Sequence, residues 1–222
     1  GTTFLYNSAG TYMLSAIVQK VTGQKVVDYL KPRLFDPLGI SGADWEENLI
    51  GVNAGGWRLR IKTEDMAKFA QLFLQKGKWE GRTVLPESWV ADATTAHIMQ
   101  DPKAPRSKKD SSDWLQGYCY QMWRCRHNAY RGDGAFGQYM LVMPELDAVM
   151  AITSESADLQ GELNLVWDHI LPAIKKDKLK EDKAGLAKLQ DRLKTLSLPL
   201  PENKPTLAAM QAIHAKTFVA AP

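Results

Sequence analysis

Three strand-forming segments follow one another in the second half of the chain, and they limit the possible fold more than any other feature. Aromatic and apolar residues gather after Gly117, and two apolar runs follow at 139–143 and 148–153. The link at 144–147 is long enough for a hairpin but too short for the crossover that parallel strands need. The sequence therefore predicts an antiparallel sheet.

A helix is predicted directly after these strands. Apolar residues recur at helical spacing from Leu159 to Ile174, and Leu163, Val166 and Trp167 belong to the same stripe. A helix with one apolar stripe buries it against another element. We expect this helix to cover one face of the sheet.

Residues 1 to about 109 are predicted to be mostly helical. One amphipathic helix follows Tyr6 and ends at Gly23, which suits a helix C-terminus. Another begins at Thr63, which can N-cap it, and Gly77 closes it. The expected fold class is therefore α/β of the α+β type, with a helical region, an antiparallel sheet and a covering helix.

Two further segments are predicted from composition. Residues 101–113 are rich in Pro, Lys, Ser and Asp, which is typical of an exposed loop. Beyond residue 175 the chain becomes polar and predicts a helix to about Leu196. We expect one domain over 1–175, and a polar helix with a C-terminal linker over 176–222.

Composition argues against several kinds of partner. The net charge is only +3, and the densest basic stretch, 175–183, is interleaved with acidic residues, so we expect no nucleic-acid partner. No apolar run approaches the roughly 20 residues that span a bilayer. The four histidines are scattered, which predicts no metal site, and we expect no cofactor. Cys119 and Cys125 are expected in one strand, too far apart to form a disulfide.

Four passages occur in an order that is informative as a set. They are Phe4–Ser8, Pro37–Ile40, Gly55–Trp57 with Asp65–Phe69, and Gly132–Gln138. Together they resemble the β-lactamase-related serine hydrolases, which include class C β-lactamases, family VIII-type esterases and D-amino-acid peptidases. The resemblance covers about Phe4 to Ile174. It implies a β-lactamase/transpeptidase-like fold, serine acyl transfer and a location in the cell envelope or periplasm of a bacterium.

The family's nucleophile is not found in this sequence. These enzymes acylate the serine of a Ser-x-x-Lys turn, and none of the serines here has a lysine three residues on. We expect the nucleophile to lie upstream of Gly1, so that the chain is an incomplete form of the fold and is inactive alone.

The resemblance assigns roles to residues near the N-terminus. Tyr6 is expected to be the general base that takes the serine proton; the alternative is a packing residue ahead of the helix. Ser8 stands where the family usually has Asn, and it is either a substrate contact or the N-cap of the helix. Asn7 could supply the missing amide.

The third motif departs from the family pattern. Family members usually place Lys or His two residues ahead of a Gly, where this chain has Gly132 ahead of Gly134. Asp133 would repel a penicillin-like carboxylate unless Arg131 offsets it, which favours esters, amides or cationic peptides; alternatively Asp133 only shapes a turn. Gly134 and Ala135 are small enough for substrate to approach the strand backbone.

The leading hypothesis is a serine acyl-transfer hydrolase of ester, amide or peptide substrates, acting in the complete protein. The alternative is a non-catalytic binding protein on a β-lactamase-like fold, and a third option is a nucleophile from another chain. Small molecules or peptides are the expected substrates. We also expect self-association through exposed core residues.

Overall fold

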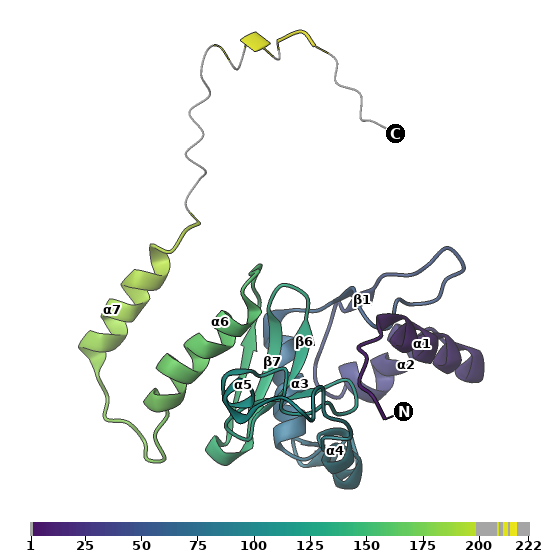
Figure 1. Cartoon of the computed structure of the whole chain (residues 1–222), viewed down its shortest axis with the longest axis horizontal. Coiled ribbons are helices and arrows are strands. Elements are labelled where there is room, and N and C mark those ends of the chain that lie inside the picture. Colours follow the sequence, from purple (N-terminus) through teal and green to yellow (C-terminus); the bar gives the residue numbers. More distant parts are fainter. Residues whose placement is uncertain (1, 199–207, 209–210, 213, 217–222) are drawn as a thin grey trace. The chain divides into compact units, whose positions relative to one another are not determined.

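The computed structural model describes residues 2–198, 208, 211–212 and 214–216 (Figure 1). Its contacts divide the chain into two units, Gly1–Lys176 and Asp177–Pro222. The second unit contains α7 (Lys183–Lys194), whose N-cap Asp182 accepts a hydrogen bond from the Gly185 amide. The first unit contains the sheet and the other helices described below. No helix in the described part of the chain has the length and apolar character needed to cross a membrane.

A four-stranded antiparallel sheet forms the centre of the first unit. Its order is β5 (Trp123–Arg124), β6 (Tyr130–Gly134), β7 (Gln138–Met143) and β8 (Ala148–Ile152). A 3-10 turn at Pro144–Leu146 connects β7 to β8. The predicted antiparallel sheet is confirmed, and the apolar runs at 139–143 and 148–153 form its last two strands.

Helices cover both faces of this sheet (Figure 1). Alternate residues of β7 enter two separate cores, as strand geometry requires. Val142 packs with α3 (Thr63–Leu74) and α4 (Glu87–Ala93), together with Ala70, Phe73, Val90 and Tyr130. The opposite core contains Tyr139, Leu141, Leu163, Val166 and Trp167.

The helix predicted after the sheet is present and changes geometry along its length. It begins as α6 (Leu159–Leu165), continues as a π-helix at Val166–Ile170 and ends as a 3-10 turn at Leu171–Ala173. Leu163 is fully buried, whereas Ile170 is half exposed. The apolar stripe therefore covers the sheet mainly through the first part of the helix.

The remaining elements of the first unit are short, apart from α1 (Ser8–Thr22). Gly23 ends α1 in the left-handed conformation, with φ 71°, as predicted. The other elements are α2 (Val26–Leu30), a π-helix (Lys31–Phe35), β1 (Asp44–Trp45), β2 (Leu59–Arg60), β3 (Lys78–Trp79), β4 (Arg82–Thr83) and α5 (Arg106–Ser111). Phe35, Leu38, Ile40 and Leu72 form a third small core.

The apolar side of α1 lies in solvent rather than in a core. Met13, Ile17 and Val21 are 54%, 51% and 79% exposed. The buried side is instead centred on Ser15, whose hydroxyl donates to the Asn53 carbonyl at 2.8 Å. Polar contacts to the loop that follows β1, rather than apolar packing, therefore hold α1.

The segment after Gly117 is a tight turn and not one extended strand. Gln121 adopts a positive φ of 60°, and the Cys119 amide donates to the Met122 carbonyl at 2.8 Å. Cys119 and Cys125 consequently do not share a strand, which corrects the prediction, and both are buried free thiols. Burial raises the pKa of each thiol to about 11.

Two other local predictions were wrong. Residues 101–113 contain α5 rather than only exposed loop, and Asp113 at their end has no exposed surface. The N-cap of α3 is Lys62 rather than Thr63, and Thr63 is the first helical residue. Gly77 does close this helix region, because its amide donates to the Leu72 carbonyl at 2.8 Å with φ 85°.

Candidate active site

Tyr6 lies in an aromatic cluster just before α1. Its ring stacks on Trp123, with centroids 5.7 Å apart and planes 24° apart, and meets Tyr118 edge-on at 6.2 Å. Phe4 packs against both Trp123 and Tyr118. Tyr6 nevertheless stays 52% exposed. The cluster holds one face of the phenol and leaves the other open to solvent.

Asn7 and Ser8 have local roles at the start of α1. Asn7 is the N-cap, and its side-chain oxygen accepts a hydrogen bond from the Gly10 amide at 3.0 Å. Ser8 is the first helical residue and is exposed. Asn7, and not Ser8, therefore caps the helix, and the Ser8 hydroxyl has no capping role. No hydrogen bond links either side chain to β6 within the described residues.

The third motif occupies β6 and the turn that follows it. β5 pairs only with Tyr130 and Arg131, so the described residues provide no strand partner for Gly132–Gly134 on that side. Ala135 is exposed in the turn to β7. Gly132 is buried, whereas Asp133 and Gly134 are partly exposed, so the end of β6 at these two residues is a strand edge where an extended ligand could form backbone hydrogen bonds.

Asp133 is neutralised inside the structure by Arg131. The Arg131 Nε donates to Asp133 Oδ2 at 2.9 Å, and Arg131 has no exposed surface. Burial raises the pKa of the Asp133 carboxyl, while the Arg131 charge opposes that rise. Arg131 therefore offsets the charge of Asp133. Asp133 is then no argument against substrates that carry a carboxylate.

Arg131 is itself held by the core behind β6. Its Nη1 donates to the Asp113 backbone carbonyl at 2.9 Å, and its guanidinium lies 4.4 Å from the centre of the Trp114 ring. The Cys125 sulfur lies 3.1 Å from the same nitrogen. These contacts fix the guanidinium, and through it the carboxylate of Asp133.

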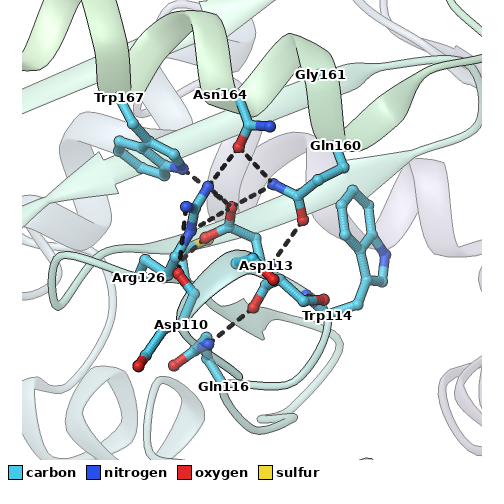
Figure 2. Close-up of polar contacts among 12 residues, drawn as sticks. Asp110, Asp113, Trp114, Gln116, Arg126, Gln160, Gly161, Asn164 and Trp167 are labelled. Carbon is cyan, nitrogen blue, oxygen red and sulfur yellow. Dashed lines mark hydrogen bonds and ion pairs between the residues drawn. The ribbon is translucent and has the colours of Figure 1, made fainter. Parts of the chain in front are cut away.

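A buried polar cluster around Asp113 completes this support (Figure 2). The Asp113 carboxylate accepts hydrogen bonds from Arg126 Nη2 at 2.9 Å, Gln160 Nε2 at 2.7 Å and Trp167 Nε1 at 2.9 Å. Burial opposes its ionisation, but these donors outweigh burial and hold the pKa of Asp113 below its usual value. Figure 2 shows Asn164 joining the cluster through Arg126 and Gln160.

Tyr118 and Gln121 connect the two halves of the site, and sequence reasoning missed both. Burial raises the pKa of Tyr118 to about 12, and the nearby Tyr6 and Asp133 add to the rise. The Gln121 side-chain oxygen accepts from the Tyr118 hydroxyl at 3.4 Å and from Thr11 of α1 at 3.2 Å. Tyr6 and Asp133 are linked through Trp123, because the Tyr6 ring stacks on it and the Arg131 guanidinium, which pairs with Asp133, lies 5.6 Å from the centre of the Trp123 ring. Local sequence gave no signal for the turn at Gln121, since Gln is not a typical turn residue.

Several other aromatic residues and His97 have different surroundings. Trp123 belongs to the cluster, but Tyr130 is core and Trp57 packs near Tyr12. His97 has a carboxylate neighbour, because its Nε2 lies 3.6 Å from Asp92 Oδ1, although its ring stacks flat on Tyr120. The described residues contain no group of three or more potential metal ligands.

Among known proteins, a family model described as Beta-lactamase matches residues 1–173 of this chain. No curated protein matches the chain. Solved structures do match, and four of them share their fold with this chain at identities between 13% and 21%.

Three of these solved structures illustrate the likeness. A Bacillus anthracis structure, assigned as a 6-aminohexanoate-dimer hydrolase, has 21% identity and a TM-score of 0.62, covering 79% of this chain and 46% of its own. A Mycobacterium bovis beta-lactamase has 19% identity and a TM-score of 0.56, with coverages of 75% and 65%. The octameric penicillin-binding protein homologue from Pyrococcus abyssi has 17% identity and a TM-score of 0.59, with coverages of 77% and 43%. The chain thus spans between 43% and 65% of the length of these structures.

Proposed function

Because the chain belongs to the beta-lactamase family, we propose that it forms part of the active site of a serine acyl-transfer hydrolase acting on small ester, amide or peptide substrates. One observation carries the proposal. Tyr6 is half exposed and stacks on Trp123, and the Arg131 guanidinium that pairs with Asp133 of β6 lies 5.6 Å from the centre of the same Trp123 ring. A base and a strand edge for substrate are the two parts of acyl-transfer chemistry that this chain can supply.

In the proposed mechanism, Tyr6 takes the proton of the attacking serine and returns it to the leaving group. The substrate lies along the partly exposed end of β6 at Asp133 and Gly134, where a backbone amide stabilises the oxyanion of the tetrahedral intermediate. Gly134 and Ala135 permit this approach because neither carries a bulky side chain. The attacking serine belongs to a Ser-x-x-Lys turn outside these 222 residues, since no serine here is followed by lysine at the third position.

A second function is favoured by the start of α1. The Asn7 side-chain oxygen is already used as a helix cap, and Ser8 supplies only a hydroxyl where the family usually has an amide. A protein with this fold could bind its ligand at the β6 edge without catalysing a reaction. This non-catalytic binding function is the alternative outcome of the experiment below.

The test is intact-mass analysis after incubation with a fluorophosphonate, on this chain and on a version extended upstream. We expect an adduct on the extended protein alone. An adduct on neither protein would favour the binding function, and an adduct on this chain would show that the nucleophile had been misplaced. Substrate hydrolysis by the extended protein would then be measured for Tyr6→Phe.

Tyr6→Phe is expected to lower the rate constant for hydrolysis about 10²- to 10⁴-fold, the usual contribution of a general base. Tyr12→Phe is the matched control, because Tyr12 lies on α1 and its hydroxyl contacts only Asn48 among the described residues, at 2.6 Å. A rate for Tyr6→Phe equal to that of the control would exclude Tyr6 as the base.

A further inference from the structure

A second concave site lies at the opposite end of β6 from the candidate active site. It is an open groove of about 290 Å³ between α3, α4 and the start of the strand. Tyr130 lines it, and Tyr130 is four residues from Gly134, roughly 13 Å along the strand. The groove therefore does not belong to the edge assigned to substrate.

The floor of this groove is apolar. It consists of Phe73, Leu74, Val90, Ala91 and Pro144, with the ring of Tyr130. The volume is at the lower end of the range for ligand pockets, which is roughly 300–1,000 Å³. A ligand that fills it is therefore small and has an apolar body.

The Tyr130 hydroxyl is an unused polar group in this floor. Tyr130 is only 5% exposed, and no hydrogen bond to its hydroxyl occurs among the described residues. The hydroxyl is not one of the fully enclosed atoms without a partner, so it keeps contact with the solvent in the groove. Burial raises the pKa of Tyr130 to about 12, so the hydroxyl remains a hydrogen-bond donor at neutral pH.

Arg124 supplies a fixed positive charge near the ring of Tyr130. Its guanidinium lies 5.7 Å from the centre of the Tyr130 ring and donates to the carbonyl of Thr94 through Nη1, at 3.4 Å, and to the backbone and side-chain oxygens of Asn128 through Nη2. A guanidinium has five N–H donors, so Nε and one proton of Nη1 remain for a ligand. Lys76 and Glu87, which also line the groove, pair with each other at 3.0 Å, so Arg124 provides its net charge.

We propose that this groove binds a small monocarboxylate with an apolar tail. The carboxylate accepts hydrogen bonds from Arg124 and the Tyr130 hydroxyl, and the tail lies over Phe73 and Val90. A carboxylate suits a charged donor beside a neutral one, and the apolar floor replaces the water around the tail. The site is separate from Tyr6, so the proposal does not depend on the function proposed above.

The test is isothermal titration calorimetry of the full chain with 4-phenylbutyrate and with its neutral amide. We expect saturable binding of the acid and at least about tenfold weaker binding of the amide, since hydrogen bonds to a charged group are stronger than those to a neutral one. Arg124→Gln should weaken binding of the acid by about the same factor, and Tyr130→Phe by a smaller one. Equal affinity for acid and amide, or no saturable binding of the acid, would overturn the proposal.

A second pair of variants tests the location without touching the polar groups. Ala91 is exposed on α4 and lines the groove, so Ala91→Trp should fill it and abolish binding while leaving the core intact. Ser88 is exposed on the same helix and does not line the groove, so Ser88→Trp should bind like the parent. Unchanged binding by Ala91→Trp would place the acid elsewhere.

Discussion

Asp113 joins elements that are distant in sequence through a single ionised carboxylate. It has no exposed surface, and its partners Arg126, Gln160 and Trp167 come from the turn before β6 and from the helix after the sheet. Removing the charge leaves Arg126 partly buried without its counter-charge, and breaking such a pair costs about 3–5 kcal/mol. We expect Asp113→Asn to lower the free energy of unfolding in urea by that amount.

The control for this substitution is Asp36→Asn. Asp36 pairs with Lys31, but both side chains are more than half exposed, and exposed pairs contribute about 0–1 kcal/mol. A loss for Asp113→Asn as small as that of the control would show that the cluster is not ionised or not formed.

The depressed pKa of Asp113 also predicts a pH dependence. A carboxyl with a lower pKa in the folded state stabilises the protein above its unfolded pKa of about 3.9 and loses this effect as pH falls through the folded value. The stability difference between parent and Asp113→Asn should therefore be constant near neutral pH and shrink below about pH 4. Urea denaturation of both proteins across this range measures it, and a difference that does not change with pH would contradict it.

Gly55 is required for the loop after β1 to approach α1. Its φ is +73°, and a methyl group there would lie 2.6 Å from Ser15 Cβ and 3.1 Å from the Thr11 carbonyl. Gly55→Ala is therefore expected to lower the free energy of unfolding for two reasons. The clash costs about 1–3 kcal/mol, and an alanine in the left-handed conformation costs about 1–2 kcal/mol. Gly42→Ala is the control, because Gly42 has φ +74° but open space around it. Equal losses of unfolding free energy would show that α1 does not lie where the structure places it.

At the scale of elements, α6 attaches to the sheet through one face only. Leu163 is fully buried among Tyr139, Leu141 and Trp167, whereas Leu165 on the same helix is 59% exposed. Leu163→Ala should lower the free energy of unfolding by about 2–5 kcal/mol, because it removes buried methyl groups and leaves a cavity. Leu165→Ala should change it by less than about 0.5 kcal/mol. Similar effects from both would mean that α6 packs in another register.

The elements that could be predicted from sequence are those with strong periodicity and local end signals. The hairpin of β7 and β8, the helix from Leu159 and the end of α1 at Gly23 all meet this description. The turn at Gln121 could not be predicted, because its hydrogen bonds come from Thr11 and Tyr118 and not from its own turn chemistry.

The burial of polar residues could not be predicted from the sequence either. Asp113 is 47 residues from Gln160 and 54 from Trp167 in sequence, so its neighbours in the chain give no sign of its partners. The candidate site was found only in part for the same reason. Tyr6 and Asp133 were singled out from motifs, whereas the residues that bring them together depend on tertiary contacts.

At the scale of the whole molecule, the exposed side of α1 departs from an ordinary amphipathic pattern. Met13, Leu14, Ile17 and Val21 lie within about 100° of one another around the helix, and each is more than half exposed. Exposed apolar patches of this kind usually mark interfaces. We therefore expect the chain to self-associate through this exposed face of α1.

Light scattering coupled to size exclusion tests this expectation. The parent chain should show a mass that rises with concentration, and Leu14→Glu with Ile17→Glu should give a monomer, because facing carboxylates repel and remove the apolar contact. The control is Leu186→Glu with Leu189→Glu on α7, where both leucines are also more than half exposed. Monomerisation by the α7 pair alone would move the interface to α7. A parent chain that is monomeric at all concentrations and melts cooperatively would contradict self-association altogether. The apolar face of α1 would then be stable in water without a partner.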